Sequence, residues 1–130
     1  MEETFRRSIM DVKAMRDFSD AEMRVFEEAD AAAEELTMPE YEHYMNHEFN
    51  SEAIQIAKKH GLFGIPVPVE YGGLGLRPII HSLVQMRLGQ LGLGFATLYD
   101  VQTFIAENII LRWGNEEQKS RYLNAEAFGF

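Results

Sequence analysis

Residues 61–75 of this 130-residue chain read GLFGIPVPVEYGGLG, and this stretch decides how the flanking segments can be arranged. Gly61 can adopt the left-handed conformation that closes a helix. Pro66 and Pro68 then disfavour a helix and keep the chain extended. Three further glycines permit positive φ angles and close backbone approach: Gly72, Gly73 and Gly75. We therefore predict an ordered connector between two helices.

Apolar residues recur at intervals of three or four on both sides of this connector, which is the period of a helix. Alternation with a period of two is absent, and the prolines within the one strand candidate, 65–69, argue against a central strand. We predict an all-α fold, a five- to six-helix bundle with an extended Pro/Gly connector. The predicted helices cover residues 19–36, 51–60, 78–88, 95–112 and 115–123, with a short helix possible in 1–17.

Several helix ends carry local signals. Ser19 with Glu22, and Asn115 with Gln118, have the spacing of a capping box. Asn50 or Ser51 can cap the helix before the connector. The run 37–39 ends in proline and predicts a helix break there. The predicted organisation is an N-terminal extension or short helix (1–17), a helical domain (18–123) and a tail (124–130).

Composition excludes several classes of function. The chain has 21 acidic and 12 basic side chains, a net charge of −9 and no cysteine. An acidic chain is a poor partner for nucleic acid, because phosphate contacts need clustered Lys and Arg. Without cysteine there can be no disulfide, thiol nucleophile or Cys-based metal site. No apolar run approaches the length of a membrane span, and residues 1–7 carry no apolar core of the kind that a signal peptide needs. We expect a cytoplasmic protein.

Other chemistry has weak local support. Glu40 and His43 have the Glu-x-x-His spacing of di-iron bundles, and His47 lies one helical turn further on. A second copy is missing, so we interpret this segment as solvated surface and predict no metal site. The glycines of 72–75 and 89–94 follow no strand and precede no Lys-Ser/Thr pair, so they are weak phosphate signals. From the residues alone, no combination of catalytic residues can be identified.

Three segments, in order along the chain, resemble the flavin-dependent acyl-CoA dehydrogenases. The connector 61–75 is similar to that family's Gly-Leu-x-Gly-x-x-x-Pro-x-Glu-Tyr-Gly-Gly-x-Gly segment. The second segment is YDVQT at 99–103, and the third is RWGNEEQKSRYL at 112–123. The resemblance covers 18–123 and implies the N-terminal helical domain of that family.

The resemblance implies a function for this domain. In the family, the first helical domain walls the acyl-CoA pocket, while FAD and the catalytic base belong to the middle and C-terminal domains. By this resemblance Tyr99, Gln102 and Thr103 are substrate-binding residues, and no residue of this chain is catalytic or cofactor-binding. The alternative is that these three residues pack and cap a buried helix.

The end of the sequence shapes the remaining expectations. Asn124 replaces the proline that often follows Tyr-Leu in the family, and the chain stops at Phe130. We expect it to bind no FAD and not to catalyse dehydrogenation alone. The expected partners are an acyl-CoA thioester, the missing domains or a full-length relative, and a second copy in a homo-oligomer. The alternative function is a stand-alone acyl-binding or protein-interaction module without catalytic activity.

Overall fold

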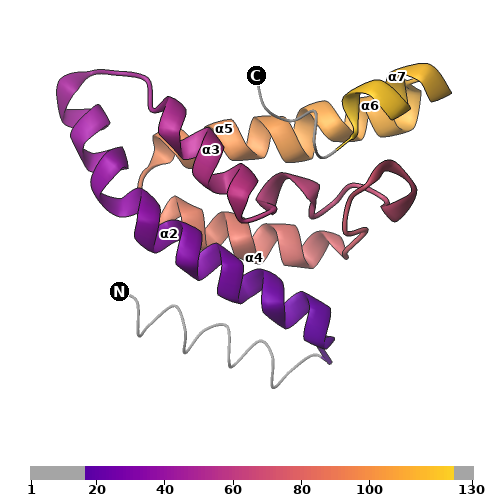
Figure 1. The fold of residues 1–130 in the computed structure, drawn as a ribbon, viewed down its shortest axis with the longest axis horizontal. Helices are drawn as coiled ribbons and strands as arrows, with labels where there is room; N and C mark the ends of the chain where they lie inside the picture. The colour runs from indigo at the N-terminus through magenta and orange to yellow at the C-terminus, as the bar shows by residue number, and fades with distance from the viewer. Residues whose placement is uncertain (1–16, 125–130) are drawn as a thin grey trace.

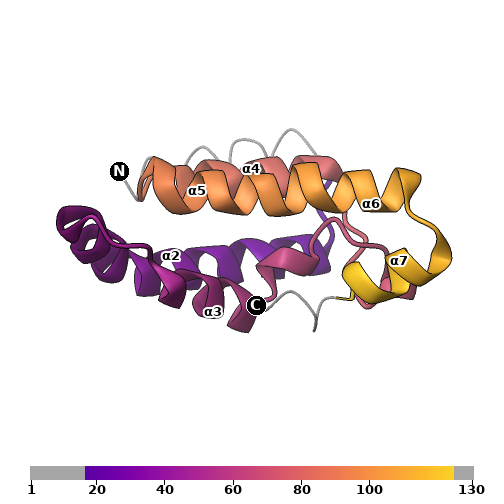
Figure 2. The same cartoon turned by 90° about the horizontal axis from the view of Figure 1, so that it is seen from above.

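The computed structural model of this protein describes residues 17–124, and these residues form two layers of helices without a strand. Figure 1 shows the order of the helices, and Figure 2 shows α2, α3 and the connector in one layer and α4 to α6 in the other. The predicted all-α fold is confirmed. The elements are α2 (Asp20–Asn46), α3 (Ser51–Lys59), α4 (Pro78–Gly89), α5 (Leu93–Asp100), η3 (Val101–Ala106), α6 (Glu107–Trp113) and α7 (Glu116–Tyr122). The short helix predicted within 1–17 and most of the tail lie outside the described residues.

The predicted caps are present. The Ser19 hydroxyl accepts from the Glu22 backbone N–H at 3.2 Å, and the Glu22 carboxylate accepts from the Ser19 N–H at 2.9 Å. Asn50 caps α3, because its side-chain oxygen accepts from the Ala53 N–H at 3.0 Å. The second capping box, between Asn115 and Gln118, starts α7. These side chains satisfy backbone donors that a helix start leaves without partners.

The break predicted at 37–39 is wrong, because α2 continues through Pro39 to Asn46. Proline removes one backbone hydrogen bond and crowds the preceding turn, but tertiary contacts can outweigh that cost. The Glu40 carboxylate provides such contacts, since it accepts from Asn50 of the α3 cap and from the Phe95 N–H at the start of α5. The second half of α2 is thus held by its neighbours rather than by its own propensity.

The connector has the predicted turns. Gly61 lies in the left-handed region at φ 68°, directly after the α3 cap, as predicted. Two 3₁₀ turns follow, η1 (Leu62–Gly64) and η2 (Val69–Tyr71), so the strand candidate does not form a strand. The chain then folds back on itself, with Leu74 N–H donating to Gly64 O at 2.8 Å and Gly75 N–H donating to Val67 O at 2.7 Å. The connector is thus an ordered loop, and Pro66, Val67 and Pro68 lie beside η3 and α6.

The core lies between the two layers and contains residues from every helix from α2 to α5. Its largest fully buried apolar side chains are Tyr99, Leu36, Leu62, Ile65, Ile80 and Leu88. Burying such side chains is the main favourable contribution to folding, roughly 1.5–3 kcal/mol each. Among the described residues, no helix is both long enough and apolar enough to cross a membrane.

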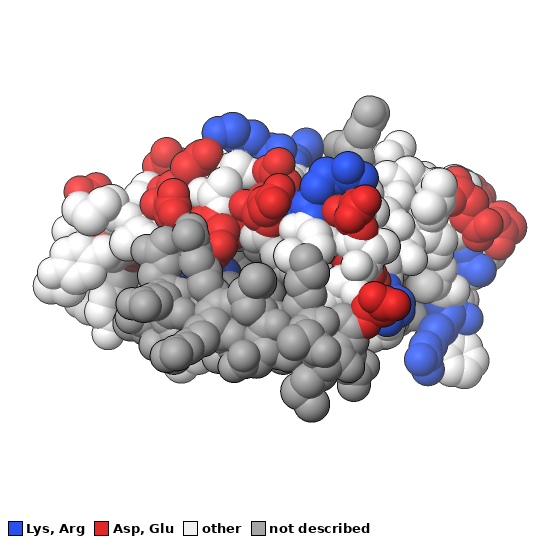
Figure 3. All heavy atoms as spheres, turned by 90° about the horizontal axis from the view of Figure 1, so that it is seen from below, with Lys and Arg blue, Asp and Glu red and all other residues white. Residues whose placement is uncertain are grey.

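Acidic side chains gather along the outer face of α2, as Figure 3 shows. Part of this charge is paired across to the end of α3, where Lys59 Nζ donates to Glu35 at 2.8 Å. His60 contacts Glu28 through Nδ1 at 2.6 Å and Glu35 through Nε2 at 3.0 Å. These contacts connect α2 and α3 on the side away from the core.

Candidate functional site

The outer side of α5 carries an apolar pocket of about 450 Å³. Helix α5 contributes Thr97 and Leu98, and Val101 and Gln102 follow in η3. The volume lies within the range of small-molecule sites, and a mostly apolar lining suits an apolar ligand. The facing wall is formed by the α2–α3 linker, α3 and η1, through Phe49, Ile54 and Phe63.

The structure separates the three residues predicted to bind substrate. Gln102 lies in the wall of the apolar pocket. Tyr99 is fully buried beneath that wall, and its hydroxyl donates to the Leu62 carbonyl at 3.0 Å. Thr103 is also fully buried, and its hydroxyl donates to the Tyr99 carbonyl at 2.7 Å. Gln102 is therefore placed to touch a ligand in the pocket, and a substrate role for the other two stays a prediction.

The sequence analysis missed most of the pocket wall. Thr97, Leu98 and Val101 share one face of a helix with Gln102, because they are spaced by one and four residues. That periodicity was visible in the sequence, but the prediction followed the motif 99–103 instead of the helix face. The facing wall carries no comparable signal, since its residues come from three separate segments that only the fold brings together.

The turn that presents Gln102 is π-helical. In η3 the Glu107 N–H donates to the Gln102 carbonyl, five residues earlier, instead of the usual four. Single π turns within α-helices are rare and occur frequently at functional sites. Here the turn joins α5 and α6, with Gln102 at the outer pocket and Thr103 and Glu107 buried in the interior.

A buried hydrogen-bond network supports this turn from α4. His81 Nε2 lies 2.6 Å from the Thr103 hydroxyl oxygen, and the His81 ring stacks on Tyr99 with centroids 5.3 Å apart. Because Thr103 donates its own proton to Tyr99, its oxygen accepts from His81, which therefore carries a proton on Nε2. Burial lowers the pKa of His81, against an opposing effect of Asp100. A neutral His81 thus holds the inner side of η3.

Glu107 is the second unusual group beside η3. Its side chain is 3% exposed, and neither carboxyl oxygen has a hydrogen-bond partner of good geometry among the described residues. Burial raises the pKa of Glu107 to about 9, while a contact from Gln102 acts in the opposite direction. The carboxyl is therefore neutral at pH 7. It faces a hollow of about 10 Å³ bordered by Pro66, Pro68 and Leu123.

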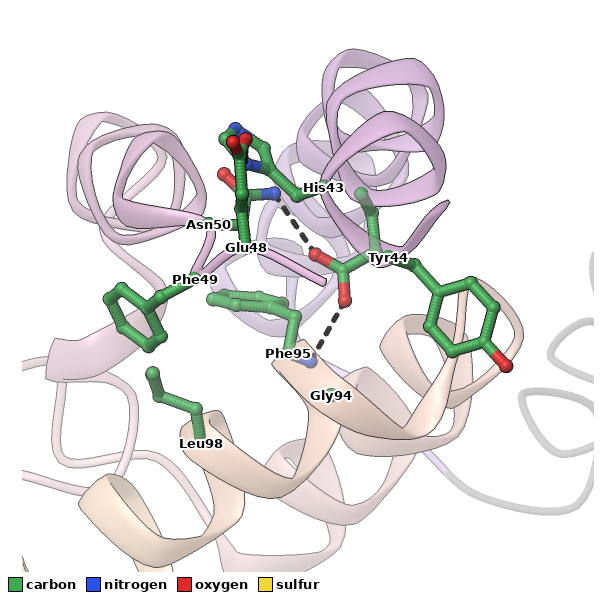
Figure 4. A pocket seen from close by; sticks show the side chains of 9 residues that line it. His43, Tyr44, Glu48, Phe49, Asn50, Gly94, Phe95 and Leu98 are labelled. Atoms are coloured by element: carbon green, nitrogen blue, oxygen red, sulfur yellow. Dashed lines mark hydrogen bonds and ion pairs between the residues drawn. The ribbon is translucent and has the colours of Figure 1, made fainter. Parts of the chain in front are cut away.

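A second hollow, of about 210 Å³, lies at the start of α5. The Glu40 carboxylate lines this hollow and accepts from Asn50 Nδ2 at 3.0 Å and from the Phe95 N–H at 3.1 Å. Dashed lines mark these hydrogen bonds at Asn50 and Phe95 in Figure 4. Gly94 leaves room for this carboxylate, because a Cβ there would lie 3.0 Å from Glu40 Oε1. Glu40 thus caps α5, whose own N-cap residue, Gly92, has no side chain to do so.

Two of the three candidate metal residues make other contacts. Glu40 is occupied by two hydrogen bonds, and His43 faces Glu48 with Nδ1 3.6 Å from the carboxylate oxygen. His47 terminates α2 in the left-handed conformation and is exposed. Across residues 17–124, no group of three His, Asp or Glu side chains has an arrangement that could hold a metal ion.

The fold and the pocket define an all-α domain with a ligand-sized apolar site on one helix. Comparison with known proteins gives its family. The sequence pattern of the acyl-CoA dehydrogenase N-terminal domain matches residues 12–129. The chain therefore belongs to the acyl-CoA dehydrogenase family, of which it spans the N-terminal domain.

Individual relatives agree with this assignment. An acyl-CoA dehydrogenase of Bacillus subtilis (strain 168) is 38% identical over 82 residues, which is 63% of this chain and 22% of that protein. A probable acyl-CoA dehydrogenase of the same organism is 33% identical over 116 residues, covering 87% of this chain and 19% of that protein. Mitochondrial isovaleryl-CoA dehydrogenase of Solanum tuberosum is 29% identical over 109 residues, which is 82% of this chain and 26% of that protein. The chain thus spans about a fifth to a quarter of these relatives.

Proposed function

We propose that this chain forms part of the wall of the substrate pocket, where the acyl chain binds, in an acyl-CoA dehydrogenase-like flavoprotein oxidoreductase. The observation that carries the proposal is the apolar pocket on α5 and η3, with Gln102 as a polar group in its wall. A saturated acyl chain has no hydrogen-bonding groups, so a wall of this composition suits it. The names of the relatives, which are dehydrogenases of acyl-CoA substrates, support the same ligand class.

The role of the chain in this proposal is binding rather than chemistry. Leu98 and Val101 exclude water from the acyl chain, and the Gln102 amide orients whatever polar group lies nearest to it. Members of the family generally use FAD, which accepts the electrons removed from the acyl group. The glycine-rich connector does not fit the flavin pyrophosphate, because Gly73 packs directly on Val67 O. We assign no flavin contact to residues 17–124.

We further propose that an exposed apolar face of η3 and α6 packs against the remainder of a longer polypeptide or against a second copy of the chain. Phe104, Ile105, Ile109 and Trp113 are 56%, 47%, 56% and 84% exposed. Large apolar side chains exposed along one stretch of the chain favour burial in an interface. The alternative, a stand-alone acyl-binding or protein-interaction module, uses the same surfaces without taking part in catalysis.

Titration of the full chain with octanoyl-CoA, followed by calorimetry, tests the acyl-binding proposal. We expect saturable binding that Val101→Glu weakens by at least roughly tenfold, because a carboxylate in an apolar wall must be desolvated. Val69→Glu is the matched control, since Val69 is 73% exposed on the connector and outside the pocket. Absence of heat with the unaltered chain, or equal loss in both variants, contradicts the proposal.

A further inference from the structure

The two hollows beside α5 share a wall. Phe49 and Leu98 border both the apolar pocket of about 450 Å³ and the second hollow of about 210 Å³. In Figure 4 the two side chains lie next to each other, Phe49 from the α2–α3 linker and Leu98 from α5. A ligand chain that lies in the apolar pocket and extends toward the start of α5 therefore meets these two side chains first.

The two halves of this wall differ in freedom. Leu98 belongs to a helix and packs against the core, so its position is set by α5. Phe49 is 68% exposed and lies between the left-handed end of α2 at His47 and the cap of α3 at Asn50. Both neighbours are anchored through hydrogen bonds, whereas the Phe49 ring can change rotamer without moving the backbone. Phe49 is thus the movable half of the wall.

The hollow behind Phe49 has an apolar side that can receive an acyl chain, where Phe95 and Leu98 lie and Gly94 contributes no side chain. Its other side is polar and is formed by Glu40, His43, Glu48 and Asn50. Glu40, a partly buried acceptor in this hollow, already accepts hydrogen bonds from Asn50 and from the Phe95 N–H, so an entering chain leaves neither donor without a partner. Moving one exposed ring would therefore join the apolar pocket to the apolar side of this hollow.

We propose that Phe49 sets the length of acyl chain that the pocket accepts. With the ring in its present position the acyl chain ends at Phe49 and Leu98, and longer chains require the ring to rotate so that they can enter the hollow beside Glu40. This inference rests on the proposed acyl-binding function, and it adds the residue that decides the chain length.

Calorimetric titration of the full chain with butanoyl-CoA, octanoyl-CoA and palmitoyl-CoA tests the inference. We expect Phe49→Ala to strengthen palmitoyl-CoA binding relative to octanoyl-CoA by at least roughly tenfold, since several methylenes gain a place out of water. Phe49→Trp should shift the preference toward the shorter thioesters. Tyr41→Ala is the matched control, because Tyr41 is 60% exposed on α2 and borders neither the apolar pocket nor the second hollow.

The outcomes separate the two proposals. If the unaltered chain binds thioesters and both Phe49 variants keep its ranking of chain lengths, the role of Phe49 is refuted while the acyl pocket stands. If no thioester binds to the unaltered chain or to any variant, the acyl-binding function fails and this inference with it. Circular dichroism of each variant checks that the helices are retained. A ranking that changes in Tyr41→Ala as it does in Phe49→Ala also overturns the proposal.

Discussion

The Glu40 carboxylate accepts a hydrogen bond from the Phe95 backbone N–H at 3.1 Å, although the two residues are 55 positions apart. One oxygen caps α5 and the other binds Asn50, which itself caps α3. The Glu40 side chain, just beyond Pro39, thus fixes the starts of α3 and α5. It also fixes the position of the α2–α3 linker, which carries Phe49. The shape of both hollows depends on this carboxylate.

Removing that carboxylate should destabilise the fold. We expect Glu40→Ala to lower the free energy of unfolding by about 1–3 kcal/mol, because one helix loses its cap and Asn50 loses a partner. Glu40→Gln should cost less, since one amide oxygen can still accept from the Phe95 N–H. Urea unfolding followed by circular dichroism measures both. Glu42→Ala, on the exposed side of the same turn, is the control, and an equal loss in it would contradict the assigned role.

Glu22 should govern stability in acid. A hydrogen bond from Arg77 Nε at 2.6 Å is the main reason that the pKa of Glu22 is lowered to about 2 from an ordinary 4.5. A lowered pKa in the folded state gives stability that is present above pH 4.5 and is lost as the pH falls toward 2. We expect Glu22→Gln to be less stable than the unaltered chain at pH 7 and to lose less stability on acidification. Thermal melts at several pH values measure this. Glu27→Gln is the control, because Glu27 is exposed on the same helix. If both variants lose the same stability on acidification, the ion pair between Glu22 and Arg77 does not govern stability in acid.

Glu107 should make the folded chain less stable at high pH, which is the opposite of the effect of Glu22. Its pKa is raised to about 9 by burial, so the folded chain holds a proton that the unfolded chain releases near pH 4.5. The associated stability is fully present below pH 4.5 and is lost as the pH rises through 9. We therefore expect Glu107→Gln to be more stable than the unaltered chain at pH 8, by a few kcal/mol at most. The exposed Glu117→Gln is the control, and identical pH profiles for Glu107→Gln and the unaltered chain would refute a buried neutral acid.

Local patterns in the sequence sufficed for most of the fold. The capping boxes at Ser19 and Asn115 and the left-handed Gly61 depend on neighbours within a few residues, so they could be predicted. The passage of α2 through Pro39 could not, because it relies on contacts of Glu40 with residues far along the chain. Local propensity is a weak guide where tertiary contacts oppose it.

The candidate site was harder to predict for the same reason. Gln102 was predicted through a motif, and the helix face that it shares with Leu98 could have been read from spacing alone. The π turn at η3 has no evident local signal, and it decides that Thr103 and Glu107 lie inside while Gln102 lies in the pocket. Phe49 lies between the predicted helices 19–36 and 51–60, in a segment for which the sequence predicted no helix.

The connector offers a test of close packing with two glycines that differ in surroundings. A Cβ at Gly73 would lie 2.1 Å from Val67 O and 2.4 Å from the Val67 Cβ, so both backbone and side chain stand in its way. A Cβ at Gly89, within the last turn of α4, would meet nothing within 4 Å. We expect Gly73→Ala to destabilise the chain by more than about 2 kcal/mol, because the loop must open to admit the methyl group.

Gly89→Ala should instead be neutral or stabilising by up to about 1 kcal/mol, since alanine restricts the unfolded chain and favours the helix. Urea unfolding of both variants gives the two free-energy differences under the same conditions. Gly73 lies in the same loop as Pro66 and Pro68, which border Glu107, and as η1, which contributes Phe63 to the apolar pocket. The Gly73 variant should therefore also weaken octanoyl-CoA binding, while Gly89→Ala should leave it unchanged. Equal stabilities for the two variants would show that the connector is not the closely packed joint described above.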